Sequence, residues 1–96
     1  MYGTLGRMKP KAGMRDELIR MMSAPPDGAA ANGYRGSYLL KADEDDEVVV
    51  AVMYDDKDAY FAMVHDPKTD ENFGKIMALL EAEPSWTDGE WLASDV

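Results

Sequence analysis

Residues 34–55, YRGSYLLKADEDDEVVVAVMYD, contain two apolar segments separated by a run of acidic residues. Both segments, residues 34–42 and 48–55, are rich in the β-branched and aromatic residues that favour strands. The acidic run at residues 43–47 is short and polar, as in the turn of a β-hairpin. We therefore expect an antiparallel hairpin at the centre of the chain.

A strand and a helix are predicted before this hairpin. Residues 2–8, YGTLGRM, are compatible with a strand, although their two glycines weaken the pattern. Residues 13–24 place apolar side chains on one helical face, and these side chains are Met14, Leu18, Met21 and Met22. Residues 24–33, APPDGAAANG, then favour a loop because prolines and glycines interrupt regular structure.

Two helices and a strand are predicted after the hairpin. Asp55 or Asp56 can cap a short helix that ends near His65. Asp66 and Pro67 favour the start of a second helix, because proline fits the first helical turn. This helix is expected to continue to Pro84, with one apolar face formed by Phe73, Ile76, Met77 and Leu80. Residues 86–92, WTDGEWL, favour a closing strand with a bulge at Asp-Gly.

The predicted order of elements is β-α-β-β-α-β, with the second helical region divided in two. This order is typical of the α+β ferredoxin-like fold, the split βαβ arrangement with a four-stranded antiparallel sheet and helices on one face. A chain of 96 residues forms one domain, so we expect a single domain over residues 1–96.

The strand expected at residues 48–55 is apolar on both sides. One side carries Val48, Val50, Val52 and Tyr54, and the other carries Val49, Ala51 and Met53. Strands that face water on one side normally alternate between polar and apolar residues. Since one chain supplies helices for only one face, we expect a homodimer in which two sheets pack together. The alternative is an open face that tolerates an apolar stripe.

The overall composition excludes several classes of partner. The net charge of −9 would repel a nucleic-acid backbone and anionic membrane surfaces. No segment approaches the roughly 18 apolar residues of a membrane helix, and no signal-peptide pattern is present. We therefore expect a cytoplasmic protein that binds neither nucleic acid nor membrane.

The residues of common catalytic and metal sites are scarce. The chain has no cysteine and one histidine, His65, and no serine lies in a nucleophile-elbow pattern. No spacing indicates a zinc site, a calcium loop or a phosphate-binding loop. We therefore expect no metal and no organic cofactor.

Aromatic side chains are the remaining candidates for a binding site. The sequence contains five tyrosines, two phenylalanines and two tryptophans. Such rings line apolar pockets, with hydroxyl groups as polar contacts, but they also fill ordinary cores and interfaces. The candidates for a pocket are Tyr38, Tyr54, Tyr60, Phe61, Phe73 and Trp86.

Four segments together resemble the antibiotic biosynthesis monooxygenase family of the dimeric α/β-barrel superfamily. They are KPKAG at 9–13, NGYRGSYLL at 32–40, VMYDDKDAY at 52–60 and LLEAEPSWTDGEWL at 79–92. The resemblance implies a sheet-to-sheet homodimer with a pocket between sheet and helices. It also implies a cofactor-independent monooxygenase acting on a small aromatic or quinol-like molecule. The alternative is a non-catalytic small-molecule-binding or regulatory dimer on the same scaffold.

The same resemblance disfavours haem degradation. The haem-degrading branch has an asparagine, a tryptophan and an iron-binding histidine where this chain has Gly6, Met63 and Phe73. Candidates for catalysis are His65, Tyr54 and Arg35. For His65 two roles are open: a residue that ends a helix, where a cation interacts favourably with the helix dipole, or a catalytic base.

Overall fold

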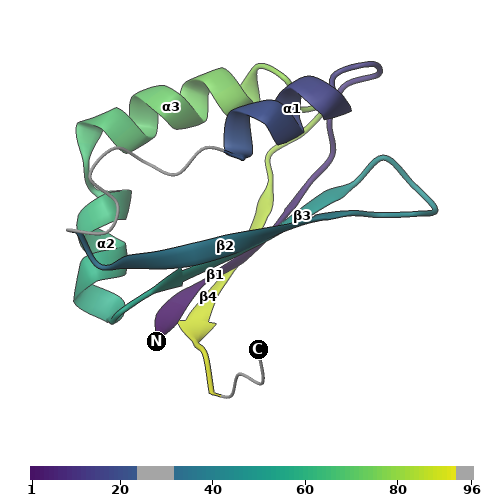
Figure 1. Ribbon diagram of the computed structural model, residues 1–96. Helices are drawn as coiled ribbons and strands as arrows, with labels where there is room; N and C mark the ends of the chain where they lie inside the picture. The colour runs from purple at the N-terminus through teal and green to yellow at the C-terminus, as the bar shows by residue number, and fades with distance from the viewer. Residues whose placement is uncertain (24–31, 93–96) are drawn as a thin grey trace.

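The computed structural model describes residues 1–23 and 32–92. Its elements are β1 (Tyr2–Met8), α1 (Arg15–Met22), β2 (Tyr34–Lys41), β3 (Val48–Tyr54), α2 (Lys57–Val64), α3 (Pro67–Met77) and β4 (Ser85–Glu90) (Figure 1). The predicted order of elements is confirmed, including the divided second helical region. The loop predicted at residues 24–33 lies mostly outside the described residues.

The four strands form one antiparallel sheet in the order β2-β3-β1-β4. This is the predicted α+β ferredoxin-like arrangement, with β1 and β3 in the centre and β4 at an edge. The predicted hairpin is confirmed, since β2 pairs with β3 from Tyr34↔Tyr54 to Lys41↔Val48. No described helix is long and apolar enough to cross a membrane.

The predicted bulge at Asp88–Gly89 is wrong. β4 pairs with β1 in an uninterrupted register from Tyr2↔Glu90 to Arg7↔Ser85. The irregularity lies instead in β2, between Tyr34 and Gly36. Gly36 has a φ of 134°, which side chains rarely allow, so glycine accommodates the shift there.

The helices cover one face of the sheet (Figure 1), and the core lies between them. Its buried residues are Met8, Leu18, Val48, Val50 and Leu80. The predicted inner face of α1 is confirmed in part, since Leu18 is fully buried and Met22 packs against the core. Met14 is exposed instead, and Ile19, which the prediction left out, packs against the core. The helix is shorter than expected at both ends, because Met14 is its N-cap and Ser23 its C-cap.

Aspartate caps begin both later helices, as the sequence predicts. The Asp56 carboxylate accepts a hydrogen bond from the Ala59 backbone N–H at 2.8 Å, and Asp66 accepts one from Lys68 N–H at 2.9 Å. His65 is the C-cap of α2. These caps satisfy backbone donors that the first helical turn leaves unpaired.

The predicted end of α3 at Pro84 is wrong, since the helix ends at Met77. A turn at residues 78–79 follows it, and the chain then runs along the connection between β1 and α1. Lys11 N–H donates to Leu79 O at 2.7 Å, and Glu81 N–H donates to Lys9 O at 2.9 Å. Leu80 is therefore buried by a strand-like bridge to Pro10 rather than by a helical face.

The other face of the sheet is open, and its apolar residues lie mainly on β2 and β3. Strand register places Leu5, Ala51 and Tyr38 in one row across it. Leu40 and Tyr38 are 62% and 60% exposed. The thinnest dimension of the molecule is 19 Å, which corresponds to one layer of helices on one sheet. Within the described residues, no helix covers this face.

Candidate active site

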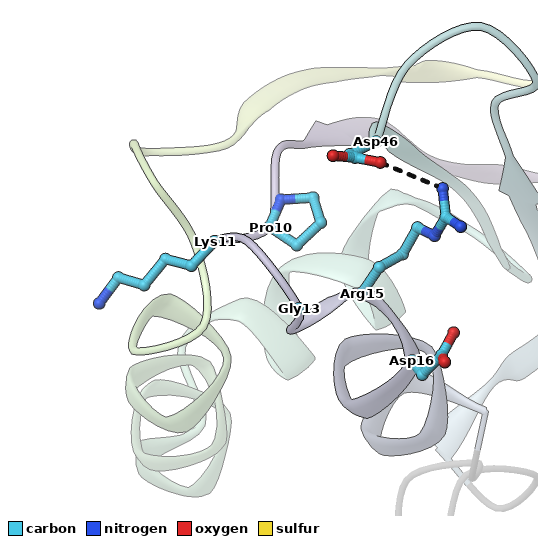
Figure 2. A pocket seen from close by; sticks show the side chains of 6 residues that line it. All are labelled: Pro10, Lys11, Gly13, Arg15, Asp16 and Asp46. Atoms are coloured by element: carbon cyan, nitrogen blue, oxygen red, sulfur yellow. Dashed lines mark hydrogen bonds and ion pairs between the residues drawn. The ribbon is translucent and has the colours of Figure 1, made fainter.

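A small polar hollow lies where β1 leads into α1 (Figure 2). It encloses about 160 Å³, and its charged side chains include Lys11, Arg15, Asp16 and Asp46. Arg15 Nη1 lies 3.4 Å from Asp46 Oδ1, so this arginine is paired within the hollow itself. The small size and the mixed charges make this hollow a poor site for an organic molecule.

A larger cavity, of about 330 Å³, lies between the sheet and helices α2 and α3. Its floor is formed by side chains of three adjacent strands. Thr4 pairs with Val52 on one side and with Asp88 on the other, and all three line the cavity. Trp86, two residues from Asp88, lines it from the same face of β4.

The helices supply the opposite wall. Tyr60, Met63 and Val64 face the cavity from α2, at the i, i+3, i+4 spacing of one helical face. Thr69, Asp70 and Phe73 come from α3. Tyr60, Met63 and Val64 therefore form the inner face of the short helix. His65, the next residue, is exposed.

Two aromatic rings form part of the apolar wall. The ring centroids of Phe73 and Trp86 are 6.0 Å apart and their planes are inclined by 54°. Trp86 lies against the backbone of β1 because its neighbour there is Gly6. A Cβ at Gly6 would lie 2.4 Å from Trp86 Cζ3. The absent side chain is thus what allows the indole to approach the sheet.

The polar contacts of the cavity centre on Tyr60. Its hydroxyl donates to Asp88 Oδ1 at 2.7 Å. Burial, and then the hydrogen bond to Asp88, raise the pKa of Tyr60 to about 12. Tyr60 therefore stays protonated at neutral pH, and the groups that can accept a proton here are the carboxylates of Asp88 and Asp70.

Three of the six predicted pocket residues line the cavity: Tyr60, Phe73 and Trp86. Tyr54 is buried, with its ring centroid 5.9 Å from that of Tyr60, and burial raises its pKa. It stands behind the cavity wall rather than in it. Phe61 packs against the rings of Tyr60 and Tyr2.

Tyr38 lies on the opposite face of the sheet from the cavity. It pairs with Ala51, whose side chain also points away from the helices. Adjacent residues on a strand face opposite sides, so a shift of one position moves a side chain to the other face of the sheet. Tyr38 does not line the cavity with the other candidates.

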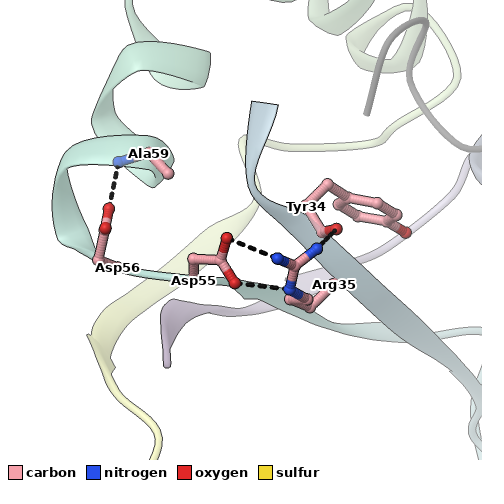
Figure 3. Close-up of polar contacts among 5 residues, drawn as sticks. All are labelled: Tyr34, Arg35, Asp55, Asp56 and Ala59. Carbon is pink, nitrogen blue, oxygen red and sulfur yellow. Dashed lines mark hydrogen bonds and ion pairs between the residues drawn. The ribbon is translucent and has the colours of Figure 1, made fainter. Parts of the chain in front are cut away.

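The three catalytic candidates are also absent from the cavity lining. Arg35 forms an ion pair with Asp55, its Nη2 lying 2.8 Å from Asp55 Oδ2 (Figure 3). The His65 backbone N–H donates to Phe61 O at 3.0 Å, and the two rings stack with centroids 6.2 Å apart. This is the geometry of a residue that ends a helix.

Sequence reasoning missed the acidic residues of the cavity. The sequence predicted only a bulge at Asp88, and it gave no role to Asp70. Asp88 lies two residues from Trp86 on one strand, so the two share a face. That spacing is the signal that would have placed a carboxylate beside the indole. Among the described residues, no group of three or more histidines or carboxylates is arranged to hold a metal ion.

No protein-family model and no curated protein sequence matches the chain. Solved structures do match it over nearly its full length. Rv0793 from Mycobacterium tuberculosis is 19% identical, with 99% of this chain and 98% of that chain covered and a TM-score of 0.79. SnoaB, a cofactor-independent oxygenase from Streptomyces nogalater, is 17% identical, with coverages of 97% and 94% and a TM-score of 0.76.

A further structure, described as an antibiotic biosynthesis monooxygenase, is 10% identical, with coverages of 97% and 100% and a TM-score of 0.75. At identities this low, the structural match shows a shared fold, and the activity of this chain depends on its own residues. The four antiparallel strands, their order and the helices on one face agree with these structures. The chain has the fold of the antibiotic biosynthesis monooxygenases.

Proposed function

We propose that the protein is a cofactor-independent monooxygenase that binds a small aromatic or quinol-like molecule in the cavity between sheet and helices. The observation that carries this proposal is the pairing of an aromatic wall with a tyrosine hydroxyl held by a carboxylate. Phe73 and Trp86 offer faces for a flat ring system, and Tyr60 and Asp88 offer a path for a proton. A cavity of about 330 Å³ is within the size range of small-molecule sites.

The chemistry requires a phenol to lose a proton and then react with molecular oxygen. The substrate hydroxyl hydrogen-bonds to Tyr60 Oη, and its proton passes to Tyr60 as the tyrosine proton passes to Asp88 Oδ1. The tyrosine acts as a relay, since its own pKa of about 12 keeps it protonated between turnovers. The electron-rich phenolate then reduces oxygen, and a C–O bond forms at a ring carbon. The O–O bond and the C–H bond of that carbon break; one oxygen atom stays as a quinone carbonyl, and the other leaves as water with the ring proton and the proton held on Asp88.

The test is oxygen uptake with a series of bicyclic and tricyclic phenols. We expect uptake in proportion to substrate loss, and a decrease in kcat of about 10²-fold or more for Tyr60→Phe and for Asp88→Asn. Tyr38→Phe is the matched control, because it removes a hydroxyl from the opposite face of the sheet. Its kcat should stay within about twofold of the unmodified protein.

The same experiment addresses the alternative of a non-catalytic binding protein. Binding of these phenols with no oxygen uptake above that of the buffer would refute the monooxygenase proposal and leave a ligand-binding function. Equal losses of activity in Tyr38→Phe and Tyr60→Phe would show that the reaction does not take place in this cavity.

We further propose that the open sheet face packs against a second copy of the chain. Support comes from the row of Leu5, Ala51 and Tyr38 and from the 62% exposure of Leu40. A flat face of this kind is suited to a two-fold interface in which the same patch meets itself. Apolar residues exposed together in this way favour association because burial removes them from water.

Light scattering tests the homodimer. We expect twice the chain mass of 10.7 kDa for the unmodified protein. Leu40→Asp should give a monomer, because a carboxylate buried without a partner costs several kcal/mol. Ala62→Asp is the control, since it adds the same charge at an exposed position on α2. A monomeric unmodified protein would contradict the proposal.

A further inference from the structure

We infer that the cavity selects ligands by charge: it accepts aromatic molecules that are neutral or carry a protonated amine, and it rejects aromatic carboxylates, sulfonates and phosphates. This inference rests on the proposed function, because it concerns the same cavity, and it narrows the class of substrate. It is carried by the charged groups that line the cavity and by the position of the cations elsewhere in the chain.

Two aspartates are the acidic residues that line the cavity. Asp88 enters from β4 and Asp70 from α3, so the carboxylates approach the cavity from the sheet and from a helix. No lysine, arginine or histidine is among the residues that line it in the described part of the chain. The remaining polar groups, on Thr4, Tyr60 and Thr69, are uncharged at neutral pH.

The arginines of the chain are engaged with carboxylates outside the cavity. There are four, and their ion pairs are Arg7–Glu47, Arg15–Asp46, Arg20–Glu17 and Arg35–Asp55. Lys57 lies over the ring of Phe61, 5.9 Å from its centroid, and Lys9 pairs with Glu81. Among the described residues, no ion pair joins a cation to Asp70 or Asp88.

The aromatic wall also favours a positively charged ligand. Trp86 and Phe73 line the cavity, and the face of an aromatic ring attracts a cation through its quadrupole, most strongly for tryptophan. A ligand ammonium near these rings has Asp88 on the strand that carries Trp86 and Asp70 on the helix that carries Phe73. The net charge of −9 gives the whole molecule a negative potential, which also attracts a cationic ligand.

The test compares three ligands with one skeleton: naphthylmethylamine, naphthylmethanol and naphthoate, measured by isothermal titration calorimetry at neutral pH and low ionic strength. We expect the amine to bind at least about tenfold more tightly than the carboxylate, with the alcohol between them. The difference should shrink at roughly 0.3 M salt, because counter-ions screen exposed carboxylates.

Matched variants assign the effect to the two carboxylates. Asp70→Asn and Asp88→Asn should each weaken amine binding about three- to tenfold and leave alcohol binding within about twofold. The controls are Glu71→Gln and Glu90→Gln, which remove the same charge from neighbouring positions of α3 and β4 outside the lining. Asparagine retains an oxygen that can accept the Tyr60 hydrogen bond, so Asp88→Asn preserves the local geometry.

The ligands and the variants together distinguish three results that would refute the reasoning. If the alcohol binds and the carboxylate binds as tightly as the amine, the charge selection is refuted and the aromatic site stands. If the controls lose as much amine affinity as the aspartate variants, the effect belongs to the net charge and the assignment to this cavity is refuted. If none of the three binds, both this inference and the aromatic site of the proposed function are refuted.

Discussion

Two glycines of β1 should respond very differently to the same added methyl group. Gly6 faces the cavity, and a Cβ there would lie 2.4 Å and 2.6 Å from the Cζ3 and Cε3 atoms of Trp86. Ordinary contact begins at 3.4 Å, so the ring must move by about 1 Å. Trp86 is 42% exposed on an edge strand, which gives it room to swing toward solvent.

Gly3 faces the other side of the same strand, and there the obstacle is backbone. A Cβ at Gly3 would lie 1.8 Å from the carbonyl oxygen of Val52 and 2.7 Å from Trp91 Nε1. The carbonyl belongs to β3, the strand paired with β1, so relief requires the two central strands to separate. A side chain can rotate away, whereas this carbonyl cannot move without disturbing the sheet.

The expected losses of stability follow from this difference. Gly6→Ala should lower the free energy of unfolding by about 1–2 kcal/mol. This is a typical overpacking penalty, reduced because alanine loses less backbone entropy on folding than glycine does. Gly3→Ala should cost more than about 4 kcal/mol, which approaches the whole stability of a domain of this length. Gly89→Ala is the control, because nothing lies within 4 Å of its Cβ position; its stability should change by less than about 0.5 kcal/mol.

Urea unfolding followed by circular dichroism measures these losses. The fluorescence of Gly6→Ala should shift to the red as Trp86 becomes more exposed, and its affinity for naphthylmethanol should fall about tenfold, since a displaced indole no longer forms the cavity wall. The reasoning is refuted if Gly3→Ala is as stable as Gly6→Ala. It is equally refuted if Gly6→Ala retains both the fluorescence and the ligand affinity of the unmodified protein.

Three further outcomes are expected. In an ultraviolet titration, the Tyr60 hydroxyl should ionise near pH 12. Because this pKa in the folded protein lies above the ordinary value of 10, the contribution of Tyr60 to stability is complete below pH 10 and is lost between pH 10 and 12. Asp88→Asn should lower that pKa, and an unchanged titration curve would contradict the assigned hydrogen bond. Asp66→Ala should reduce the free energy of unfolding by about 1 kcal/mol by removing the cap of α3, and a loss below the error of a denaturant curve would argue against the cap. His65→Gln should cost less than about 1 kcal/mol and leave turnover within about tenfold; a hundredfold loss with intact folding would make His65 catalytic.

The parts of the fold that the sequence predicted depend on local rules. The hairpin follows from two apolar segments around an acidic turn, and the starts of α2 and α3 follow from Asp56 and from Asp66 before Pro67. The end of α3 was not predictable in this way. Leu80 continues the helical spacing, yet backbone bonds between its neighbours and the segment around Pro10 hold it in a β-bridge. Those bonds join residues far apart in sequence.

The site was predicted by residue type and only partly by position. Tyr60 and Phe73 have the helical spacing of inward-facing residues, so their place in the cavity follows from periodicity. On a strand, every second residue faces the helices, and only those residues can line the cavity. Which set faces the helices depends on the register with the partner strand. Tyr38 was therefore placed in the pocket wrongly, and Asp88 was not recognised as a cavity residue. One lies on the open face and the other lines the cavity.

The two tryptophans explain why β1 tolerates glycines that weaken its strand pattern. Trp86 is directly opposite Gly6 and lies on the helix-facing side. Trp91 follows β4 and lies on the open side, where its Nε1 donates to Val52 O at 3.1 Å across the position that a side chain at Gly3 would occupy. The glycines are three residues apart, so they point to opposite faces. Each leaves a space for one indole, and the residues that are poorest for a strand thus allow the edge of the sheet to be packed from both sides.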